Sequence, residues 1–235
     1  MQLPNYLKPG ILVKRYKRFL ADIDFNGELV TVHCPNPGSM IGLSSPGLRV
    51  WCSLSNDKKR KYPYTLEIIQ VGETLVGINT LLPNKIVKEA LLNKKIPSLS
   101  EYSEIYSEFK FEKGTRFDFL LKQKKLSPVI IEVKNVHMCR TKSSKYKIAE
   151  FPDSITTRGS KHLLELSKAV SQGYRAIMLY VIQRGDCKKF SIANDIDPVY
   201  AKNFHLSQKN GVEVQVWVCD ISIKEIKLSH QIFFN

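Results

Sequence analysis

Two acidic residues and a lysine form the most chemically suggestive pattern in this sequence. Asp118 lies in the segment RFDF (116–119), and Glu132 and Lys134 lie in the mostly apolar run IIEVK (130–134). On a strand, Glu132 and Lys134 point to the same side, because side chains alternate with a period of two. Two carboxylates can hold Mg²⁺ or Mn²⁺ through oxygen, and the metal lowers the pKa of a bound water while a lysine stabilises developing charge. The pattern predicts a metal-dependent phosphodiesterase site with Asp118, Glu132 and Lys134 as catalytic residues.

The same short pattern has a simpler interpretation. Glu132 and Lys134 can form an ordinary ion pair on an edge strand, since a motif of three residues recurs by chance in a lysine-rich chain. Asp118 and Glu132 nevertheless lie within otherwise apolar strands, where surface exposure explains an acid less well. Both interpretations stay open on the sequence.

Positive charge is the second chemical signal. The 235 residues include 36 Lys and Arg against 22 Asp and Glu, a formal net charge of +14. Such a balance favours a polyanionic partner, either nucleic acid or an acidic membrane face. Residues 134–161 hold seven basic and two acidic residues. Arg158, Lys161 and His162 are predicted in the first turn of a helix, where cations oppose the helix dipole but phosphate binds well. They predict an anion site, a solvated helix face being the alternative.

Basic and aromatic residues also alternate at two places in the first half, in the segments KRYKRF (14–19) and KKRKY (58–62). This composition suits phosphate contact and base stacking on a barrel surface. Solubilising surface charge is the alternative. The predicted nucleic-acid-binding residues of these segments are Lys14, Arg15, Tyr16, Lys17, Arg18, Arg60 and Lys61.

The elements that must position these residues change character near residue 82. Before it, short strands separated by turns are predicted at 11–25, 28–34, 48–54, 62–71 and 75–79. Five short strands indicate an OB-like five-stranded β-barrel over residues 1–82. After it, helices are predicted at 83–92, 158–172 and 198–209, with strands at 102–111, 115–121, 128–133, 176–182 and 212–218. Residues 140–152 are predicted as a loop, and the order indicates an α/β domain over residues 83–235.

Several classes of protein are excluded by what the sequence lacks. No run of 18 apolar residues exists, so no membrane-spanning helix or membrane partner is expected. The basic first 20 residues do not form a signal peptide. Five widely spaced cysteines without a CxxC pair predict reduced thiols, hence a cytoplasmic protein without a zinc site.

Taken together, the residues resemble the sugar fermentation stimulation protein (SfsA) family from about Leu12 to Leu228. The segments that carry the resemblance are LVKRYKRFLAD (12–22), HCPN (33–36), GSM (38–40), RKYP (60–63), NTL (79–81), KEAL (88–91), RFDFL (116–120), EVK (132–134), FPD (151–153) and TRGSKHL (157–163). Two departures from the family pattern are Pro37 and His137, each where threonine is expected.

The resemblance implies an α/β (α+β) protein in which an OB-like domain is joined to a PD-(D/E)XK nuclease-like domain. It implies DNA binding and a link to the regulation of sugar metabolism, especially that of maltose. The nuclease-type motif falls on Asp118, Glu132 and Lys134. Glu89, on the preceding helix, is implied as a further metal ligand beside Asp118 and Glu132, with Glu108 as a second candidate.

The sequence thus predicts a DNA-binding protein without base specificity that carries a nuclease site dependent on Mg²⁺ or Mn²⁺. The alternative is a non-catalytic regulatory protein that uses the nuclease-like fold only as a binding platform. A metabolic enzyme or a membrane-surface protein is supported by charge alone.

Overall fold

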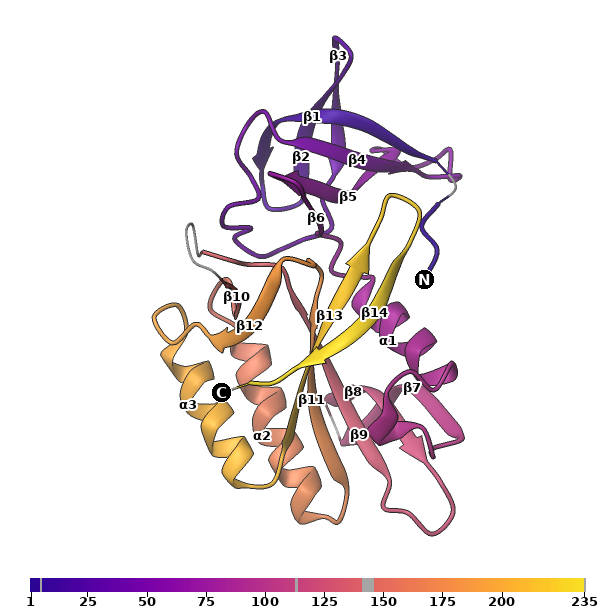
Figure 1. The fold of residues 1–235 in the computed structure, drawn as a ribbon, viewed down its shortest axis with the longest axis vertical. Coiled ribbons are helices and arrows are strands. Elements are labelled where there is room, and N and C mark those ends of the chain that lie inside the picture. The colour runs from indigo at the N-terminus through magenta and orange to yellow at the C-terminus, as the bar shows by residue number, and fades with distance from the viewer. Residues whose placement is uncertain (5, 113, 141–145, 235) are drawn as a thin grey trace.

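The computed structural model describes residues 1–4, 6–112, 114–140 and 146–234. Figure 1 shows a smaller all-β unit at one end and a larger unit of helices around a sheet at the other. None of the described helices has the length and apolar composition needed to cross a membrane.

The smaller unit is a closed ring of strands. Its strands are β1 (Leu7–Tyr16), β2 (Leu20–Phe25), β3 (Glu28–His33), β4 (Arg49–Leu54), β5 (Tyr64–Val71) and β6 (Thr74–Gly77). They are ordered β3-β2-β1-β4-β5-β6, and β3 also pairs with β5, so that five strands close on themselves with β6 outside. The predicted OB-like fold is confirmed. The long strand predicted at 11–25 is in fact two strands.

The two hairpin turns of this ring differ in chemistry. Asn26 and Gly27, which join β2 to β3, have φ values of 59° and 95°, as the Asn-Gly pair predicts. Between β1 and β2, Lys17 and Arg18 also have positive φ values, 49° and 61°. Residues with a Cβ adopt this left-handed region at a cost of roughly 1–2 kcal/mol each. Lacking glycine or asparagine, this turn gave no signal in the sequence.

The larger unit is a mixed sheet covered on both faces. Its helical elements are α1 (Pro83–Leu92), a short 3₁₀ turn η1 (Pro97–Leu99), α2 (Thr157–Ser171) and α3 (Pro198–Lys209). Its strands are β7 (Glu104–Glu112), β8 (Thr115–Lys122), β9 (Val129–Val136), β10 (Lys147–Phe151), β11 (Arg175–Ile182), β12 (Cys187–Ile192), β13 (Glu213–Ile221) and β14 (Ile226–Ile232).

The main sheet has the order β14-β13-β11-β9-β8-β7. Strands β9, β11 and β13 are parallel, because helices α2 and α3 form the crossovers between them, and the other pairs are antiparallel. One apolar cluster joins α1 to one face of the sheet, and a second joins α2 and α3 to the other face (Figure 1). The sheet therefore carries β8 and β9, with the predicted catalytic residues, in its interior.

All three predicted helices are present with bounds within one residue, and the Thr156 side chain caps α2 by accepting from the Gly159 N–H. The sequence did not predict three of the strands, β10, β12 and β14. Strand β10 replaces part of the loop predicted at 140–152, because it pairs with β12 away from the main sheet, and residues 141–145 of that loop lie outside the described part. Strand β14 is a half-exposed edge strand. These strands lack a clear apolar alternation, and long-range pairing decides their conformation.

The two units share buried contacts. Leu7, Trp51 and Ile68 of the ring belong to the same apolar cluster as helix α1. Across the junction, the Gly77 N–H donates to the Gln183 carbonyl over 2.9 Å. The amide of Gln183 in turn donates to the Asn79 carbonyl over 3.2 Å. The ring is thus held in a defined position against the sheet.

Candidate active site and nucleic-acid interface

The first acidic residue of the predicted site lies where two strands separate. Regular pairing of β8 with β9 ends at Phe119 and Ile131, so Asp118 and Glu132 form the next, unpaired position. There the Oδ2 of Asp118 accepts a hydrogen bond from the Val133 backbone N–H over 2.7 Å. Its Oδ1 accepts one from the Asn84 side chain of α1 over 2.6 Å. The Val133 N–H is thus satisfied by the Asp118 side chain and not by a backbone carbonyl of β8.

Glu132 is the centre of a buried polar cluster, with only 4% of its surface exposed. Its Oε1 accepts a hydrogen bond from the Lys134 ammonium over 2.6 Å. The same oxygen contacts Nδ1 of His162, which comes from α2. The other ring nitrogen, Nε2, accepts from Arg158 Nε over 3.4 Å, so Nδ1 carries the proton and donates to Glu132.

Burial and neighbouring charge move the pKa values of the two acids in opposite directions. Burial, followed by the negative charge of Glu132, raises the pKa of Asp118 to about 6. Burial also acts to raise the pKa of Glu132. The charge of Lys134 and the contact with His162 outweigh it, so the net pKa lies below the ordinary value. The site therefore holds one firmly ionised carboxylate beside one that ionises with difficulty.

The donor set fits a hard divalent cation. The Oε2 of Glu132 is buried and has no hydrogen-bond partner among the described residues. A cation beside this oxygen would also relieve the repulsion that raises the pKa of Asp118. Within the described ranges, no cluster of three or more His, Cys, Asp or Glu residues forms a metal cage. Two carboxylates completed by water and phosphate oxygens are the usual environment of Mg²⁺ in nucleotide enzymes.

The structure brings Asp118, Glu132 and Lys134 together but places Glu89 elsewhere. The Glu89 carboxylate accepts a hydrogen bond from the Met1 amine over 2.7 Å, close to β14. Glu108, the second candidate, lines a small cavity of about 160 Å³ together with Asp118 and Lys88. Glu108 is itself paired with Arg116 over 3.3 Å.

A larger cavity, about 760 Å³, lies between the β7–β8 hairpin and the start of α2. Its basic lining residues are Lys110, Arg116, Arg158, Lys161 and His162, and its acidic one is Glu112. We call it the basic groove. Since His162 lines the groove and contacts Glu132, the groove leads to the carboxylate cluster. Arg158, Lys161 and His162, predicted to bind nucleic acid, thus line one cavity, where the two cations are exposed and His162 is 6% exposed.

In the first predicted basic cluster, residues 14–18, some side chains have partners within the fold and others are exposed. Nη2 of Arg15 lies 2.9, 2.8 and 2.8 Å from the carbonyl oxygens of Arg18, Asn36 and Gly38. Tyr16 donates its hydroxyl to Asp22 over 2.9 Å. Lys14 lies 3.4 Å from the same carboxylate. These three side chains have partners within the fold.

The remaining cations of the ring are more accessible. Lys17 and Arg18 are exposed at the β1–β2 turn, and Lys61 is exposed in the loop before β5. Arg60 instead donates to Thr65 over 3.1 Å and contacts His33 Nδ1 over 3.2 Å.

In the basic stretch of residues 134–161, Arg140 is paired with Glu150 and Asp195. Lys142 and Lys145, also in that basic stretch, lie outside the described residues.

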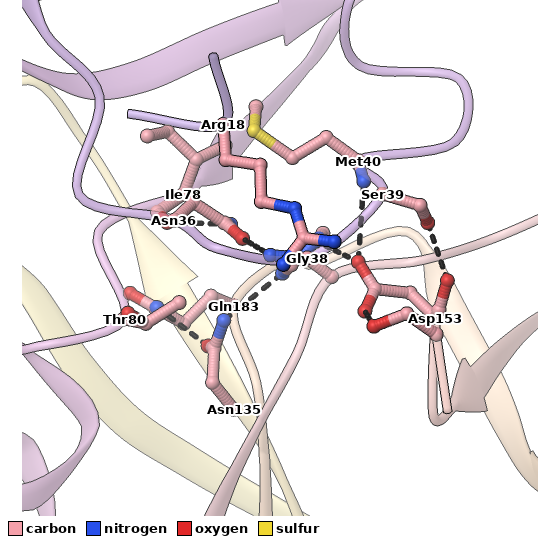
Figure 2. A network of polar contacts seen from close by, with 12 residues as sticks. Arg18, Asn36, Gly38, Ser39, Met40, Ile78, Thr80, Asn135, Asp153 and Gln183 are labelled. Atoms are coloured by element: carbon pink, nitrogen blue, oxygen red, sulfur yellow. Dashed lines mark hydrogen bonds and ion pairs between the residues drawn. The ribbon is translucent and has the colours of Figure 1, made fainter. Parts of the chain in front are cut away.

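Figure 2 shows a polar network where the ring meets the sheet. The Asn36 amide donates to the Ile78 carbonyl over 2.9 Å, and the Gln183 amide donates to Asn135 Oδ1 over 2.7 Å. Ser39 donates its hydroxyl to the Asp153 carbonyl. The Met40 N–H donates to the Asp153 carboxylate over 3.2 Å.

The two departures from the family pattern both lie at this junction. His137 is 5% exposed, and its Nε2 lies 3.3 Å from the Asp153 carboxylate. Its Nδ1 lies 2.9 Å from the Asn135 side-chain nitrogen. Pro37 lines the same cavity as His137 and Asp153.

Sequence reasoning missed three residues that the structure places in the site. Asn84 binds Asp118, and Lys110 and Arg116 extend the basic groove. The position of Asn84, directly after the helix-starting Pro83, was the only local signal for it. Arg116 lies two residues before Asp118, on the same strand. The contact between His162 and Glu132 had no local signal, because 30 residues separate the two.

Comparison with known proteins gives a consistent result. The family model described as "Sugar fermentation stimulation protein RE domain" matches residues 81–225, and "SfsA N-terminal OB domain" matches residues 13–78. The chain is 47% identical to a "Sugar fermentation stimulation protein homolog" of Brucella anthropi, with 95% of each chain covered. It is 44% identical to the homolog of Caulobacter vibrioides, with 100% of this chain and 97% of that protein covered.

One solved structure has the same fold along the whole chain. It is described as the structure of Pyrococcus furiosus SfsA in complex with Ca²⁺. The TM-score is 0.88 at 22% identity, with 100% of this chain and 98% of that chain covered. At this identity the likeness concerns the fold.

Proposed function

This chain belongs to the sugar fermentation stimulation protein (SfsA) family, and on that basis we propose that it binds DNA without base specificity and cleaves phosphodiester bonds with a divalent metal ion. We place the division between the OB domain and the nuclease-like domain at residues 82 and 83. The observation that carries the proposal is the joint position of Asp118, Glu132 and Lys134 beside a groove lined by cations.

Each residue of the cluster has a defined task in this proposal. Asp118 and Glu132 would hold Mg²⁺ or Mn²⁺, using the Oε2 of Glu132 that has no partner in the described part of the chain. The ion would polarise the phosphate and supply a nucleophilic water at neutral pH. Lys134 places a positive charge beside the scissile phosphate, where negative charge develops. His162 orients Glu132 by donating to its Oε1.

The basic groove would hold the phosphates on either side of the reacting one. Lys110, Arg116, Arg158 and Lys161 supply four charges around one cavity. Neutralising phosphates releases condensed counterions, so binding is expected to weaken steeply with salt. A cytoplasmic location stays a prediction from the number and wide spacing of the cysteines in the sequence. The link to maltose metabolism remains a prediction from family resemblance.

A second candidate function is DNA binding without cleavage. It is supported by the ion pair between Lys134 and Glu132, which neutralises the buried carboxylate without any metal. In this case the nuclease-like fold would serve only as a platform for the basic groove.

Thermal melting with and without Mn²⁺, beside incubation with plasmid and single-stranded DNA, tests the proposal. At a hundredfold excess over Kd, a bound ion stabilises the fold by about 2.7 kcal/mol. We expect a rise in Tm, with Mg²⁺ and Ca²⁺ as further ions, and cleavage with Mg²⁺ or Mn²⁺. Asp118→Asn should remove both, while Glu101→Gln, at an exposed carboxylate of the same domain, should retain both. A Tm shift without cleavage would favour the platform, and no shift would contradict metal binding.

A further inference from the structure

A second cavity, about 330 Å³, lies where the ring meets the sheet. We call it the interdomain cleft. The ring contributes Arg18 to its lining, and the nuclease-like domain contributes Asn135, His137 and Asp153. Its volume is at the low end for small-ligand sites, which occur preferentially between domains. It has room for one unit of a polymer but not for a duplex.

The polar groups of the cleft are held in place before any ligand arrives. The Asp153 carboxylate is bound by the Met40 N–H and lies 3.3 Å from His137 Nε2. Gly38 allows this approach, since a Cβ there would collide with the carboxylate. Asn135 is fixed by the Gln183 amide over 2.7 Å. Fixed donors and acceptors of this kind can recognise the edge of a nucleobase.

The cleft also has an apolar wall. Phe151, Pro152 and Ile155 line it, and Ile155 is 77% exposed although it is a large apolar side chain. Unstacked bases pack against such apolar and aromatic surfaces while their edges form hydrogen bonds. A polar floor beside an apolar wall therefore suits a base better than it suits a phosphate alone.

The cation at the rim of the cleft lies on a strained turn. Lys17 and Arg18 both have positive φ values, which glycine or asparagine would adopt at less cost. Strained backbone persists where the side chains it presents are needed. Figure 2 shows the Arg18 side chain extending from the ring toward Gly38. Arg18 is exposed, whereas backbone carbonyls hold Arg15, so the Arg18 guanidinium is suited to a phosphate.

The cleft and the basic groove flank the same helix end. Thr156, the cap of α2, lines the cleft, and Thr157, its first residue, lines the groove. One polynucleotide strand can therefore contact the groove, the carboxylate cluster and the cleft in succession.

We propose that the interdomain cleft receives one unstacked nucleotide of a single-stranded nucleic acid. Arg18 binds its phosphate, and Asn135, His137 and Asp153 face the edge of its base. This inference rests on the proposed function, since it names the form of nucleic acid that the same surface takes. A paired base cannot enter, so the protein selects single strands or frayed ends over blunt duplex.

The test compares how tightly the full chain binds single-stranded and duplex DNA. EDTA is present, so that cleavage does not interfere. Fluorescence anisotropy is measured with a single strand of about 12 nucleotides, within the usual site size of OB folds, and with the blunt duplex of the same sequence. The wild type should bind the single strand more tightly. Arg18→Gly should weaken single-strand binding about tenfold, the effect of one lost base or phosphate contact. Its duplex affinity should stay within about twofold.

Two further variants make the outcome specific. Lys124→Ala removes the same charge from the exposed β8–β9 turn, far along the strands from the carboxylates, and should change both affinities equally and little. Ser154→Trp adds bulk at an exposed residue that lines the cleft, and should weaken only the single strand. Melting of Arg18→Gly serves as a folding control, because glycine tolerates the positive φ of that position.

The results separate this inference from the proposed function. Equal losses of single-strand and duplex binding in Arg18→Gly, or unchanged single-strand binding in Ser154→Trp, would overturn the cleft assignment while leaving metal-dependent cleavage intact. Conversely, selective loss of single-strand binding in a protein that neither binds metal nor cleaves DNA would support the cleft and reject the nuclease activity.

Discussion

The Asp118 carboxylate accepts a hydrogen bond from the backbone N–H of Val133, 2.7 Å away, at the position where β8 and β9 stop pairing. An ordinary ladder would have used that N–H for a backbone carbonyl. The bond instead holds a half-buried carboxylate beside Glu132, although the two charges repel each other. The geometry of the site is therefore maintained by the sheet itself and does not require a ligand.

The raised pKa of Asp118 predicts how stability depends on pH without metal. The pKa is about 6 in the folded protein against an ordinary value of 3.8, so the folded state binds the proton more tightly. The associated stability is present below the ordinary pKa and is lost as the pH rises through about 6. Asp118→Asn removes this dependence. In EDTA we expect it to exceed the wild type in stability by about 3 kcal/mol near pH 7.

Urea unfolding of both proteins across this pH range checks the prediction. The difference between them should close near pH 4, where the wild-type carboxyl is also neutral in the folded state. A constant difference across the range would show that Asp118 titrates normally.

The buried pair of Lys134 and Glu132 predicts a metal-dependent rescue. Their side chains are 15% and 5% exposed, so Lys134→Met leaves a buried carboxylate with His162 as its remaining neighbour. Loss of one partner from a buried ion pair costs about 3 kcal/mol. Melting in EDTA should show this loss, Mn²⁺ should reverse part of it, and cleavage should remain absent in both conditions.

The pair of Lys168 and Glu112 provides a matched control, since both of these side chains are substantially exposed. Exposed ion pairs contribute little, so Lys168→Met should melt close to the wild type. If Mn²⁺ stabilised Lys134→Met no more than it stabilises Asp118→Asn, the assignment of Glu132 as a metal ligand would be wrong.

The distinction between paired and accessible cations predicts different salt dependences. Lys161 lines the basic groove, whereas Arg140 is bound by Glu150 and Asp195. Each phosphate contact contributes about 0.9 to the slope of log K against log salt. Lys161→Ala should therefore reduce the slope by about one unit, and Arg140→Gln should leave it unchanged while lowering Tm. Titrations at several salt concentrations measure this, and an equal change of slope in both would disprove the distinction.

Arg15 and Lys17 are two residues apart, but we expect substitution of Arg15 to lower stability and substitution of Lys17 to weaken DNA binding. Arg15 satisfies carbonyl groups of Asn36 and Gly38, so Arg15→Ala leaves partly buried acceptors unpaired at a cost of about 1–3 kcal/mol. Lys17 is exposed, so Lys17→Ala should keep the stability and lose about one phosphate contact from the salt slope. Melting and DNA titration of both variants would contradict this account if Arg15→Ala melted like the wild type.

Much of the fold could be predicted from local patterns. The helix at Pro83–Leu92 follows from proline at its start and apolar spacing, and the helix at Pro198–Lys209 was predicted with its observed bounds. Strands β10 and β12 could not be predicted, since their short polar segments become strands only by pairing with each other. A tertiary contact decided what local propensity left open.

In the site, too, local contacts could be predicted from the sequence and long-range contacts could not. The spacing of Glu132 and Lys134 along one strand predicts their contact, because period-two alternation is a local property. The partners Asn84 and His162 lie 34 and 30 residues from the acids they bind, so only the folded chain brings them there. Arg15 had the same composition signal as Lys17, yet its role depends on carbonyls from a distant loop.

The bonds that Gln183 makes to Gly77, Asn79 and Asn135 have a thermodynamic consequence for the whole chain. Leu7, Trp51 and Ile68 bury their side chains against the helix of the other unit, so neither unit can melt without exposing the apolar surface of its neighbour. The two should therefore behave as one cooperative unit. Scanning calorimetry is expected to give a single heat-absorption peak whose van't Hoff enthalpy equals the calorimetric one, as two-state unfolding requires.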